Sequence, residues 1–352
     1  MGSMPESPVH TLENNDQPLQ YSQAEQCNNI THSSPVEDHQ NKTDQAKNWE
    51  EIEIDIGWGI LRGKARGLGP RRMLGLHGWL DNANTFDLIA SFLPEDVRFI
   101  SLDLPGHGHS DHFPPAFIYD PRAYMGSVKK AMTAIGWNNF ILLGHSMGAV
   151  VGIMYASVFP EDVEAFINID IIKPWSYPPE KYAMQYKQYF LQYFDNEKKA
   201  SQPALVYDKE ELVKKTIEGS KSLDDRGARI LLQRGATRAE NGDGWILTRD
   251  LRAKVYFVGF LSFEAWLELA RAITCPLLLI KAKDGHHHYE LPEKNEAMLS
   301  AFKQDCKHYR FYEMLGKHHI HLTHPKLVAD HILTFINEYK SILQTSANHI
   351  VN

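Results

Sequence analysis

Apolar positions along the chain recur either with the period of a strand or with that of a helix, and segments of the two kinds alternate. Residues 51–56 read Glu-Ile-Glu-Ile-Asp-Ile, an alternation typical of a half-buried strand, and residues 140–143 form a continuous apolar run typical of a buried one. We expect strands at 51–56, 60–65, 70–76, 97–103, 140–143, 163–170, 276–280 and 309–315. Helical spacing marks 120–137, 291–302 and 325–343, and a helix also opens within 81–86. Strands that alternate with helices predict an α/β fold.

The alternation stops between residues 171 and 274. Helical stretches take its place, at about 180–194, 208–220, 225–234 and 264–272, and they carry many aromatic residues. We interpret most of these aromatics as helix-packing core. A helical insertion after the sixth strand would lie over the end of the sheet as a cap, with a few aromatics, such as Trp175, lining a pocket. We therefore predict a core of residues 49–170 and 275–343, a cap of residues 171–274, and a C-terminal tail from 344 to 352.

Composition narrows the class of protein. The 352 residues are 43% hydrophobic and have a formal net charge of -7 without a basic stripe, which argues against a nucleic-acid partner. Residues 1–48 are polar, with seven acidic residues and two lysines, and are expected to be a disordered tail. No apolar run reaches membrane-spanning length and no secretory signal is visible. Three sparse cysteines, Cys27, Cys275 and Cys306, argue against disulfides and for a reducing, cytoplasmic location.

The strongest chemical signal is Gly144-His-Ser146-Met-Gly148. It follows the apolar run 140–143 and precedes a helix-compatible segment, which is the strand–turn–helix context of a nucleophile elbow. The two glycines remove side chains that would clash where the helix crosses close to the strand. The sequence therefore predicts Ser146 as a nucleophile at the tip of a strained turn.

A serine nucleophile needs a base and an acid, which in this architecture follow it in the order acid, then histidine. His318 is the first histidine after Gly316, so we place the base there, with His319 as the alternative and His321 and His324 as packing or loop residues. Asp284, after the strand 276–280, is the favoured acid. Asp170, at the end of the sixth strand, is the competing candidate.

Backbone amides should supply the oxyanion hole, one from Met147 at the helix start and one from Trp79. We place His77, Gly78, His145 and Trp175 around the substrate. The tripeptide His286-His-His288 invites a metal site, but no cysteine or second carboxylate cluster has ligand spacing, so no metal is expected. The Gly-rich loop 104–110 lacks a nucleotide-binding pattern.

Together these motifs resemble the α/β-hydrolase superfamily, across about residues 49–339. The resemblance is carried by Leu76-His-Gly-Trp79, Asp103-Leu-Pro-Gly-His-Gly-His-Ser110, the elbow, and Gly316-Lys-His-His-Ile-His-Leu322. The first hairpin with Trp58-Gly59, His77-Gly-Trp-Leu-Asp-Asn82 and Lys281-Ala-Lys-Asp-Gly285 are most similar to the kraken-type or serine hydrolase-like proteins. The resemblance implies a mostly parallel eight-stranded sheet flanked by helices, a helical cap after strand 6, and no cofactor.

Two departures from relatives are informative. Epoxide hydrolases and haloalkane dehalogenases have Asp at the elbow, so Ser146 argues against both activities. Many relatives have Gly three residues before the acid, where this chain has Lys281. The leading hypothesis is a serine hydrolase that cleaves small or medium carboxylic esters or similar acyl compounds through an acyl-enzyme. The alternatives are a ligand-binding or sensor protein with little turnover, and a C–C bond hydrolase.

Overall fold

The computed structural model describes residues 48–240, 242–255, 261–285 and 292–350, with side chains described as far as residue 339. All of the predicted disordered tail except Asn48 lies outside the described residues. Within the described ranges, no helix combines the length and the apolar character needed to cross a bilayer.

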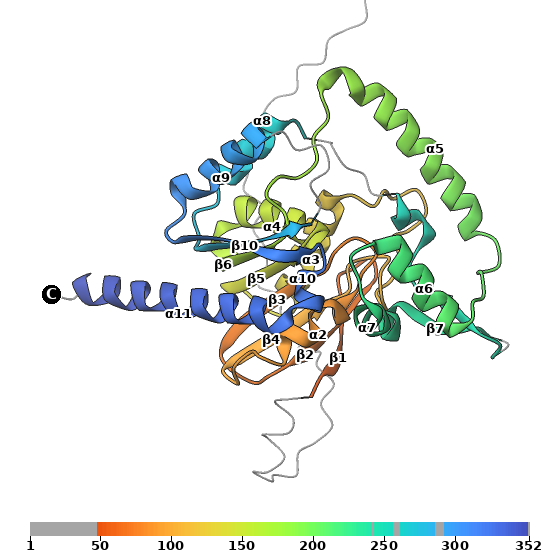
Figure 1. Cartoon of the computed structure of the whole chain (residues 1–352), viewed down its shortest axis with the longest axis horizontal. Coiled ribbons are helices and arrows are strands. Elements are labelled where there is room, and N and C mark those ends of the chain that lie inside the picture. The colour runs from red at the N-terminus through yellow and green to blue at the C-terminus, as the bar shows by residue number, and fades with distance from the viewer. Residues whose placement is uncertain (1–47, 241, 256–260, 286–291, 351–352) are drawn as a thin grey trace, which may run out of the picture. The chain divides into compact units, whose positions relative to one another are not determined.

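An eight-stranded sheet forms the centre of the fold (Figure 1). Its strands are β1 (Glu50–Asp55), β2 (Ile60–Arg66), β3 (Arg71–Leu76), β4 (Val97–Leu102), β5 (Phe140–His145), β6 (Val163–Ile169), β9 (Leu277–Asp284) and β10 (Tyr309–Lys317). The strand order is β1-β2-β4-β3-β5-β6-β9-β10. The β1–β2 and β2–β4 pairs are antiparallel, and all pairs from β4 to β10 are parallel. The predicted eight-stranded, mostly parallel sheet is therefore confirmed.

Helices cover both faces of the sheet because its central strands are apolar on both faces. The helical segments are η1 (Ala83–Phe86), α2 (Asp87–Ala90), α3 (Pro121–Ala134), α4 (Met147–Val158), η2 (Pro160–Asp162), η3 (Pro179–Lys181), α5 (Tyr182–Ala200), α6 (Lys209–Ser220), α7 (Asp225–Gly235), η4 (Leu251–Lys254), α8 (Phe263–Arg271), α9 (Pro292–Asp305), α10 (Ile320–Thr323) and α11 (Pro325–Ile350). Phe140 and Leu142 of β5 share a core cluster with residues of α3, α4, α8 and α9. Ile141 and Leu143 point to the other face and share a second cluster with α2, α10 and α11.

The long connection between β6 and β9 carries α5, α6, α7, η4 and a two-stranded sheet of β7 (Ala236–Arg238) and β8 (Trp245–Leu247). Figure 1 shows α5, α6, α7 and β7 beside the sheet rather than in its helical layers. We refer to residues 171–262 as the insertion. Arg234 of α7 fastens it to the core, since its guanidinium binds Asp103 (Nε–Oδ2 2.5 Å) and Glu51 (Nη1–Oε1 2.7 Å).

Two boundaries differ from the sequence expectation. Helix α8 falls within the cap predicted for residues 171–274, but Trp266 of this helix is buried in the main core together with residues of α4 and α9. It therefore belongs to the layer on the sheet, because an amphipathic helix looks the same in sequence whichever apolar surface it covers. Helix α11 continues to Ile350, beyond the predicted end at residue 343.

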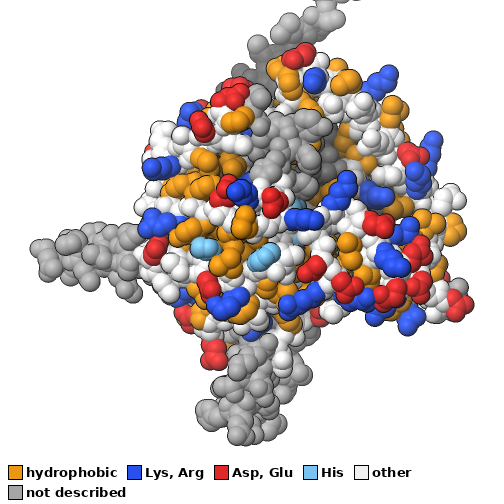
Figure 2. Space-filling model, in the orientation of Figure 1, with side chains coloured by type: hydrophobic (Ala, Val, Ile, Leu, Met, Phe, Trp, Pro, Cys, Tyr) orange, Lys and Arg blue, Asp and Glu red, His pale blue; other side chains and the backbone are white. Residues whose placement is uncertain are grey.

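On the outer surface of the insertion, charged side chains are paired. Figure 2 shows acidic and basic side chains interspersed over the side of the molecule formed by α6 and α7. Arg229 of α7 binds Glu210 of α6 (2.6 Å) and Asp225 of its own helix (2.8 Å). These exposed pairs add little to stability.

Candidate active site

Ser146 lies at a strained turn between β5 and α4. Its φ of 51° and ψ of -117° place a non-glycine residue in a rarely populated backbone region. The flanking glycines permit the close crossing: a Cβ on Gly148 would lie 1.9 Å from the carbonyl oxygen of Leu76, and one on Gly144 would lie 2.6 Å from the carbonyl oxygen of Gly148. The local geometry is that of a nucleophile elbow.

The loop after β10 brings His318 to the carboxylate of Asp170. The Nδ1 of His318 lies 2.6 Å from Oδ2 of Asp170, and both residues are buried. Since an ionised carboxylate only accepts hydrogen bonds, Nδ1 carries the proton and Nε2 is available as a base. Ser146 and His318 line the same pocket. Among the described contacts, no hydrogen bond joins the Ser146 hydroxyl to His318; such bonds are often long before substrate binds.

Asp284, the acid favoured from sequence, is not brought to His318. It is the last residue of β9, is exposed, and pairs in register with Lys317 on β10. Asp170 has a positive φ of 64°, which turns the chain at the end of β6. Gly285 leaves room for the Asp170 carboxylate, because a Cβ there would lie 2.3 Å from its Oδ2. The geometry thus favours the competing candidate, Asp170.

Asp170 also has a partner that sequence reasoning left without a role. Lys281 of β9 places its ammonium group 2.6 Å from Oδ1 of Asp170, and its side chain is only 3% exposed. The amide of Ala282 donates to the same oxygen at 2.9 Å. Asp170 is therefore held from β9 and from the His318 loop at once. A lysine within an otherwise apolar strand was the signal that a buried carboxylate lay opposite.

The protonation states suit a neutral base beside an ionised acid. Burial lowers the pKa of His318 to about 3, although its hydrogen bond to Asp170 acts in the opposite direction. Burial raises the pKa of Asp170, but the bond from His318 and the charge of Lys281 outweigh it, so the pKa lies below its ordinary value. At neutral pH the imidazole can accept a proton.

Two backbone amides next to the elbow have the arrangement of an oxyanion hole. Met147 is the first residue of α4, and Trp79 lies in the loop after β3 that lines the pocket. Within the described part of the chain, neither amide donates a hydrogen bond to a protein acceptor. The indole of Trp79 is fixed by a bond from its Nε1 to the carbonyl oxygen of Ala253 (2.8 Å), which links this loop to the insertion.

Behind the elbow lies a buried cluster of Asp81, His145, His319 and His321, which sequence analysis did not connect. His319 accepts from Ser222 at Nδ1 (2.7 Å), so its Nε2 can donate to Asp81 (3.3 Å). The Nε2 of His145 lies 3.1 Å from the carbonyl oxygen of His318, which couples the elbow to the base loop. The cluster joins three segments that are distant in sequence, and it fixes the loops of the site relative to one another.

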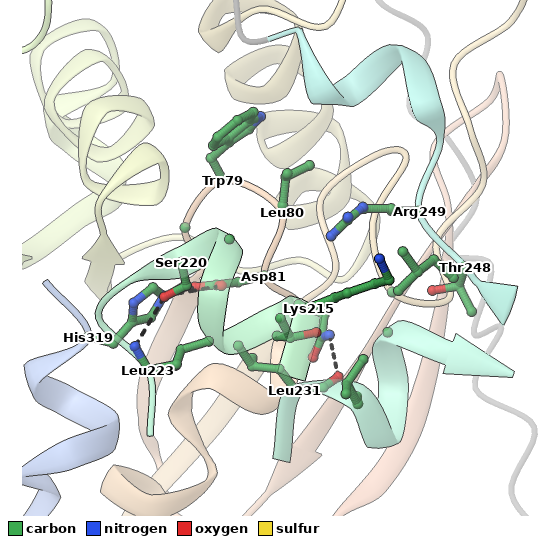
Figure 3. Close-up of a pocket in the computed structure, with 18 of the residues that line it drawn as sticks. Trp79, Leu80, Asp81, Lys215, Ser220, Leu223, Leu231, Thr248, Arg249 and His319 are labelled. Atoms are coloured by element: carbon green, nitrogen blue, oxygen red, sulfur yellow. Dashed lines mark hydrogen bonds and ion pairs between the residues drawn. The ribbon is translucent and has the colours of Figure 1, made fainter. Parts of the chain in front are cut away.

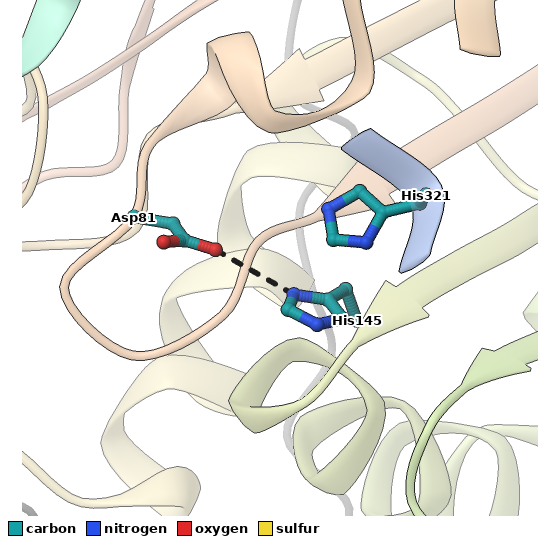
Figure 4. A group of neighbouring side chains, drawn as sticks. All are labelled: Asp81, His145 and His321. Atoms are coloured by element: carbon teal, nitrogen blue, oxygen red, sulfur yellow. Dashed lines mark ion pairs between the residues drawn. The ribbon is translucent and has the colours of Figure 1, made fainter. Parts of the chain in front are cut away.

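Three members of this cluster are of metal-binding type. Figure 4 shows Asp81, His145 and His321 facing one another, and their donor atoms lie within 4.8 Å of each other. The Nδ1 atoms of His145 and His321 are buried and form no hydrogen bond, although Nδ1 of His145 lies 3.5 Å from Oδ2 of Asp81, the contact marked in Figure 4. These atoms could hold a transition-metal ion by donor type. The tripeptide His286-His-His288, for which no metal was expected, lies outside the described residues.

The pocket has a volume of about 470 Å³ and lies between the core loops and the insertion (Figure 3). Ser146 and His318 line it from the core, and Tyr207, Lys215 and Arg249 line it from the insertion. Its size is that of a site for a small molecule.

The residues placed around the substrate from sequence divide into two pairs. Gly78 and His145 line the pocket. His77 and Trp175 do not belong to its lining. His77 is fully buried, and its imidazole bridges the amide of Leu104 (2.9 Å) and the carbonyl oxygen of Gly78 (2.7 Å), so it supports the loop rather than facing the cavity.

A family profile, curated relatives and a solved structure all relate this chain to hydrolases or to proteins of similar fold. A profile of the alpha/beta hydrolase fold matches residues 72–325. The chain is 33% identical over 297 residues to "Probable serine hydrolase" of Drosophila melanogaster, covering 82% of this chain and 88% of that protein. It is 31% identical to human "Serine hydrolase-like protein 2", covering 81% and 93%. A solved structure of a hypothetical protein from Pseudomonas aeruginosa PAO1 superposes with a TM-score of 0.73 at 28% identity, covering 82% of this chain and 99% of that one.

Proposed function

The chain belongs to the α/β-hydrolase fold family, and from that premise we propose that it is a serine hydrolase that cleaves carboxylic esters or related acyl compounds through an acyl-enzyme. One observation carries the proposal: a serine on a strained elbow opens into the same pocket as a histidine whose Nδ1 is held 2.6 Å from a buried carboxylate. That combination activates a hydroxyl group as a nucleophile.

In the first half of the proposed reaction, Ser146 attacks the carbonyl carbon while Nε2 of His318 takes the hydroxyl proton. Asp170 keeps the proton of His318 on Nδ1 and stabilises the imidazolium that forms. The amides of Met147 and Trp79 donate to the oxyanion of the tetrahedral intermediate. His318 then gives its proton to the leaving group, and the acyl group stays on Ser146.

In the second half, water replaces the leaving group. His318 removes a proton from the water molecule as it attacks the acyl-enzyme, and it returns that proton to Ser146 when the acid product departs. The insertion acts in this proposal as a cap, because its residues wall the pocket opposite the elbow. Excluding bulk water strengthens the interaction of the amides with the oxyanion.

A fluorophosphonate probe tests the nucleophile directly. We expect the folded wild-type protein to be labelled at Ser146, located by peptide mass spectrometry, and we expect Ser146→Ala to remain unlabelled. Ser157→Ala is a matched control, since this serine is on the same helix, with its hydroxyl bonded to backbone carbonyls. Labelling should be accompanied by hydrolysis of p-nitrophenyl esters. Folded protein that neither reacts with the probe nor hydrolyses any ester of a graded acyl series would instead support the ligand-binding alternative.

A further inference from the structure

The pocket carries a positive charge that the proposed chemistry does not use. Three of its lining side chains are cationic: Lys215 of α6, Arg249, and Lys254 of η4. The lining contains one carboxylate, Asp81, which is already engaged by His319 at 3.3 Å. A cavity with this excess of cations lies in a protein whose net charge is -7, so the local charge opposes the overall balance.

Arg249 is the residue that stands out within this group. Its side chain is partly buried, and its Nε is shielded from solvent without a hydrogen-bond partner. No carboxylate in the described ranges forms an ion pair with it. Removing a charged group from water without a partner costs free energy, so an arginine in this state requires an explanation.

Neighbouring arginines show that this chain does pair its buried guanidinium groups. Arg252, three positions further on, binds Asp250 at 2.7 Å and donates to the carbonyl oxygen of Phe113 at 2.5 Å. Arg234 binds Asp103 at 2.5 Å. Arg249 differs from both in facing the pocket, and burial lowers its pKa, with Tyr207 and Asp81 opposing that effect. Within the described ranges, its guanidinium group forms no hydrogen bond with the protein, although Arg249 lines the pocket.

A second cationic side chain of the pocket, Lys215, supports an anionic ligand. Lys215 lines the same pocket as Arg249, and Figure 3 shows both side chains among the residues of its wall. Lys215 is half-exposed, and its contact with Glu211 is long, at 3.7 Å. The planar fork of a guanidinium binds carboxylate or phosphate oxygens in pairs, and a nearby ammonium adds charge without strict geometry.

We propose that Arg249 binds an anionic group of the substrate, a carboxylate or a phosphate, and that Lys215 adds positive charge to the same pocket, so that the enzyme acts on acyl compounds that carry a negative charge away from the scissile bond. This inference rests on the proposed function, since it names the substrate class for the reaction at Ser146. Charge-assisted hydrogen bonds in a desolvated site give a preference of about 10- to 100-fold for the charged substrate.

Two matched substrate pairs separate the possible sources of the charge. The carboxylate pair is the p-nitrophenyl monoester of adipic acid against p-nitrophenyl hexanoate. The phosphate pair is hexanoyl-coenzyme A against the hexanoyl thioester of N-acetylcysteamine. We expect at least one pair to show a preference of about 10-fold or more in kcat/KM for the anionic member, which declines as salt is added.

Substitution of Arg249 then tests whether this residue causes the preference for the anionic substrate. We expect Arg249→Met to reduce the ratio of kcat/KM between anionic and neutral members to near unity, and Arg249→Lys to retain part of it because the charge stays and the fork is lost. Arg271→Met is the control: this arginine pairs with Glu268 on the surface of α8, and the ratio should not change. A wild-type enzyme without preference in either pair, or a preference that survives in Arg249→Met, would overturn the inference.

A binding measurement keeps this test separate from the test of hydrolysis. In Ser146→Ala, adipate and coenzyme A can be titrated by calorimetry, because binding needs no turnover. We expect the anion that wins the kinetic comparison to bind Ser146→Ala and to bind Ser146→Ala/Arg249→Met about 10-fold or more weakly. If the anion binds through Arg249 but the wild-type protein hydrolyses none of the substrates, the proposed reaction alone is contradicted. If the wild-type protein hydrolyses the substrates but the anion does not bind through Arg249, the anion site alone is contradicted.

Discussion

The choice between Asp170 and Asp284 as the triad acid gives the sharpest prediction. Asp170→Asn preserves the size of the side chain and removes its charge, so it no longer holds the proton of His318 on Nδ1 or stabilises the imidazolium. We expect kcat for a p-nitrophenyl ester to fall about 10³- to 10⁴-fold. Asp284 is exposed at the end of β9, so Asp284→Asn should leave kcat close to the wild-type value.

The same substitution should also destabilise the fold, and the structure gives the reason. Lys281, whose side chain is only 3% exposed, would lose the carboxylate that lies 2.6 Å from its ammonium group. Breaking a buried ion pair from one side costs about 3–5 kcal/mol, because the buried charge that remains has lost its carboxylate. Urea unfolding of Asp170→Asn should show this loss in the free energy of unfolding.

A double variant separates catalysis from folding. Asp170→Asn/Lys281→Met removes both charges, and we expect it to recover most of the lost stability while kcat stays low. The reasoning fails if Asp284→Asn loses as much activity as Asp170→Asn, or if the stable double variant regains wild-type turnover. In the second case the single variant would have lost activity through unfolding.

Two further predictions concern the charge and the backbone of the site. Lys281→Met should shift the acidic limb of the kcat/KM profile, measured from about pH 2.5 to about pH 8, to higher pH, because His318 must be neutral to act, its pKa is about 3, and losing a nearby cation favours the imidazolium. Lys283→Met, on the exposed end of the same strand, should leave the limb in place, and a limb that moves to lower pH in Lys281→Met would contradict the assigned role. Gly148→Ala should lower the free energy of unfolding by about 1–3 kcal/mol or more, since its Cβ would lie 1.9 Å from a backbone oxygen. Gly126→Ala, within α3 with open space around it, should raise that free energy by about 0.5–1 kcal/mol, and an equal change for both variants in chemical denaturation would refute the steric argument.

Local patterns determine much of this fold. The alternation in β1 and the apolar runs of β5 and β6 come from residues that are adjacent in sequence, so a strand can be recognised without its neighbours. The elbow is local too, because the turn and both glycines lie within the five residues from Gly144 to Gly148. The strands of the sheet and the position of Ser146 on its turn could therefore be predicted, whereas the order of the strands was not.

The acid could not be assigned in this way. Asp170 follows β6 and Asp284 is the last residue of β9. These parallel strands end at the same edge of the sheet, and spacing alone does not tell which side chain turns inward. The decision depends on a positive φ at Asp170 and on Lys281 across the strand pair. A left-handed backbone at a non-glycine residue has no reliable sequence signal.

The pairing state of a side chain is also invisible in sequence. Arg249 and Arg252 lie in the same short stretch, yet Arg252 binds Asp250 and Arg249 faces the pocket without a carboxylate among the described residues. The buried cluster around His145 likewise depends on side chains from three separate segments. Such features arise from tertiary contacts, and only coordinates reveal them.

The position of Asp170 couples the proposed acid to the insertion. Asp170 follows β6 directly, so it is the residue at which the insertion leaves the sheet. A change at the base of the insertion would displace an acid that depended on that chain segment alone. Lys281 and the amide of Ala282 hold the Asp170 carboxylate from β9 instead, and β9 is paired on both sides, with β6 and β10, in the parallel part of the sheet. The insertion can therefore vary in sequence, and with it the charge of the pocket, while the distance between Asp170 and His318 stays set by the core.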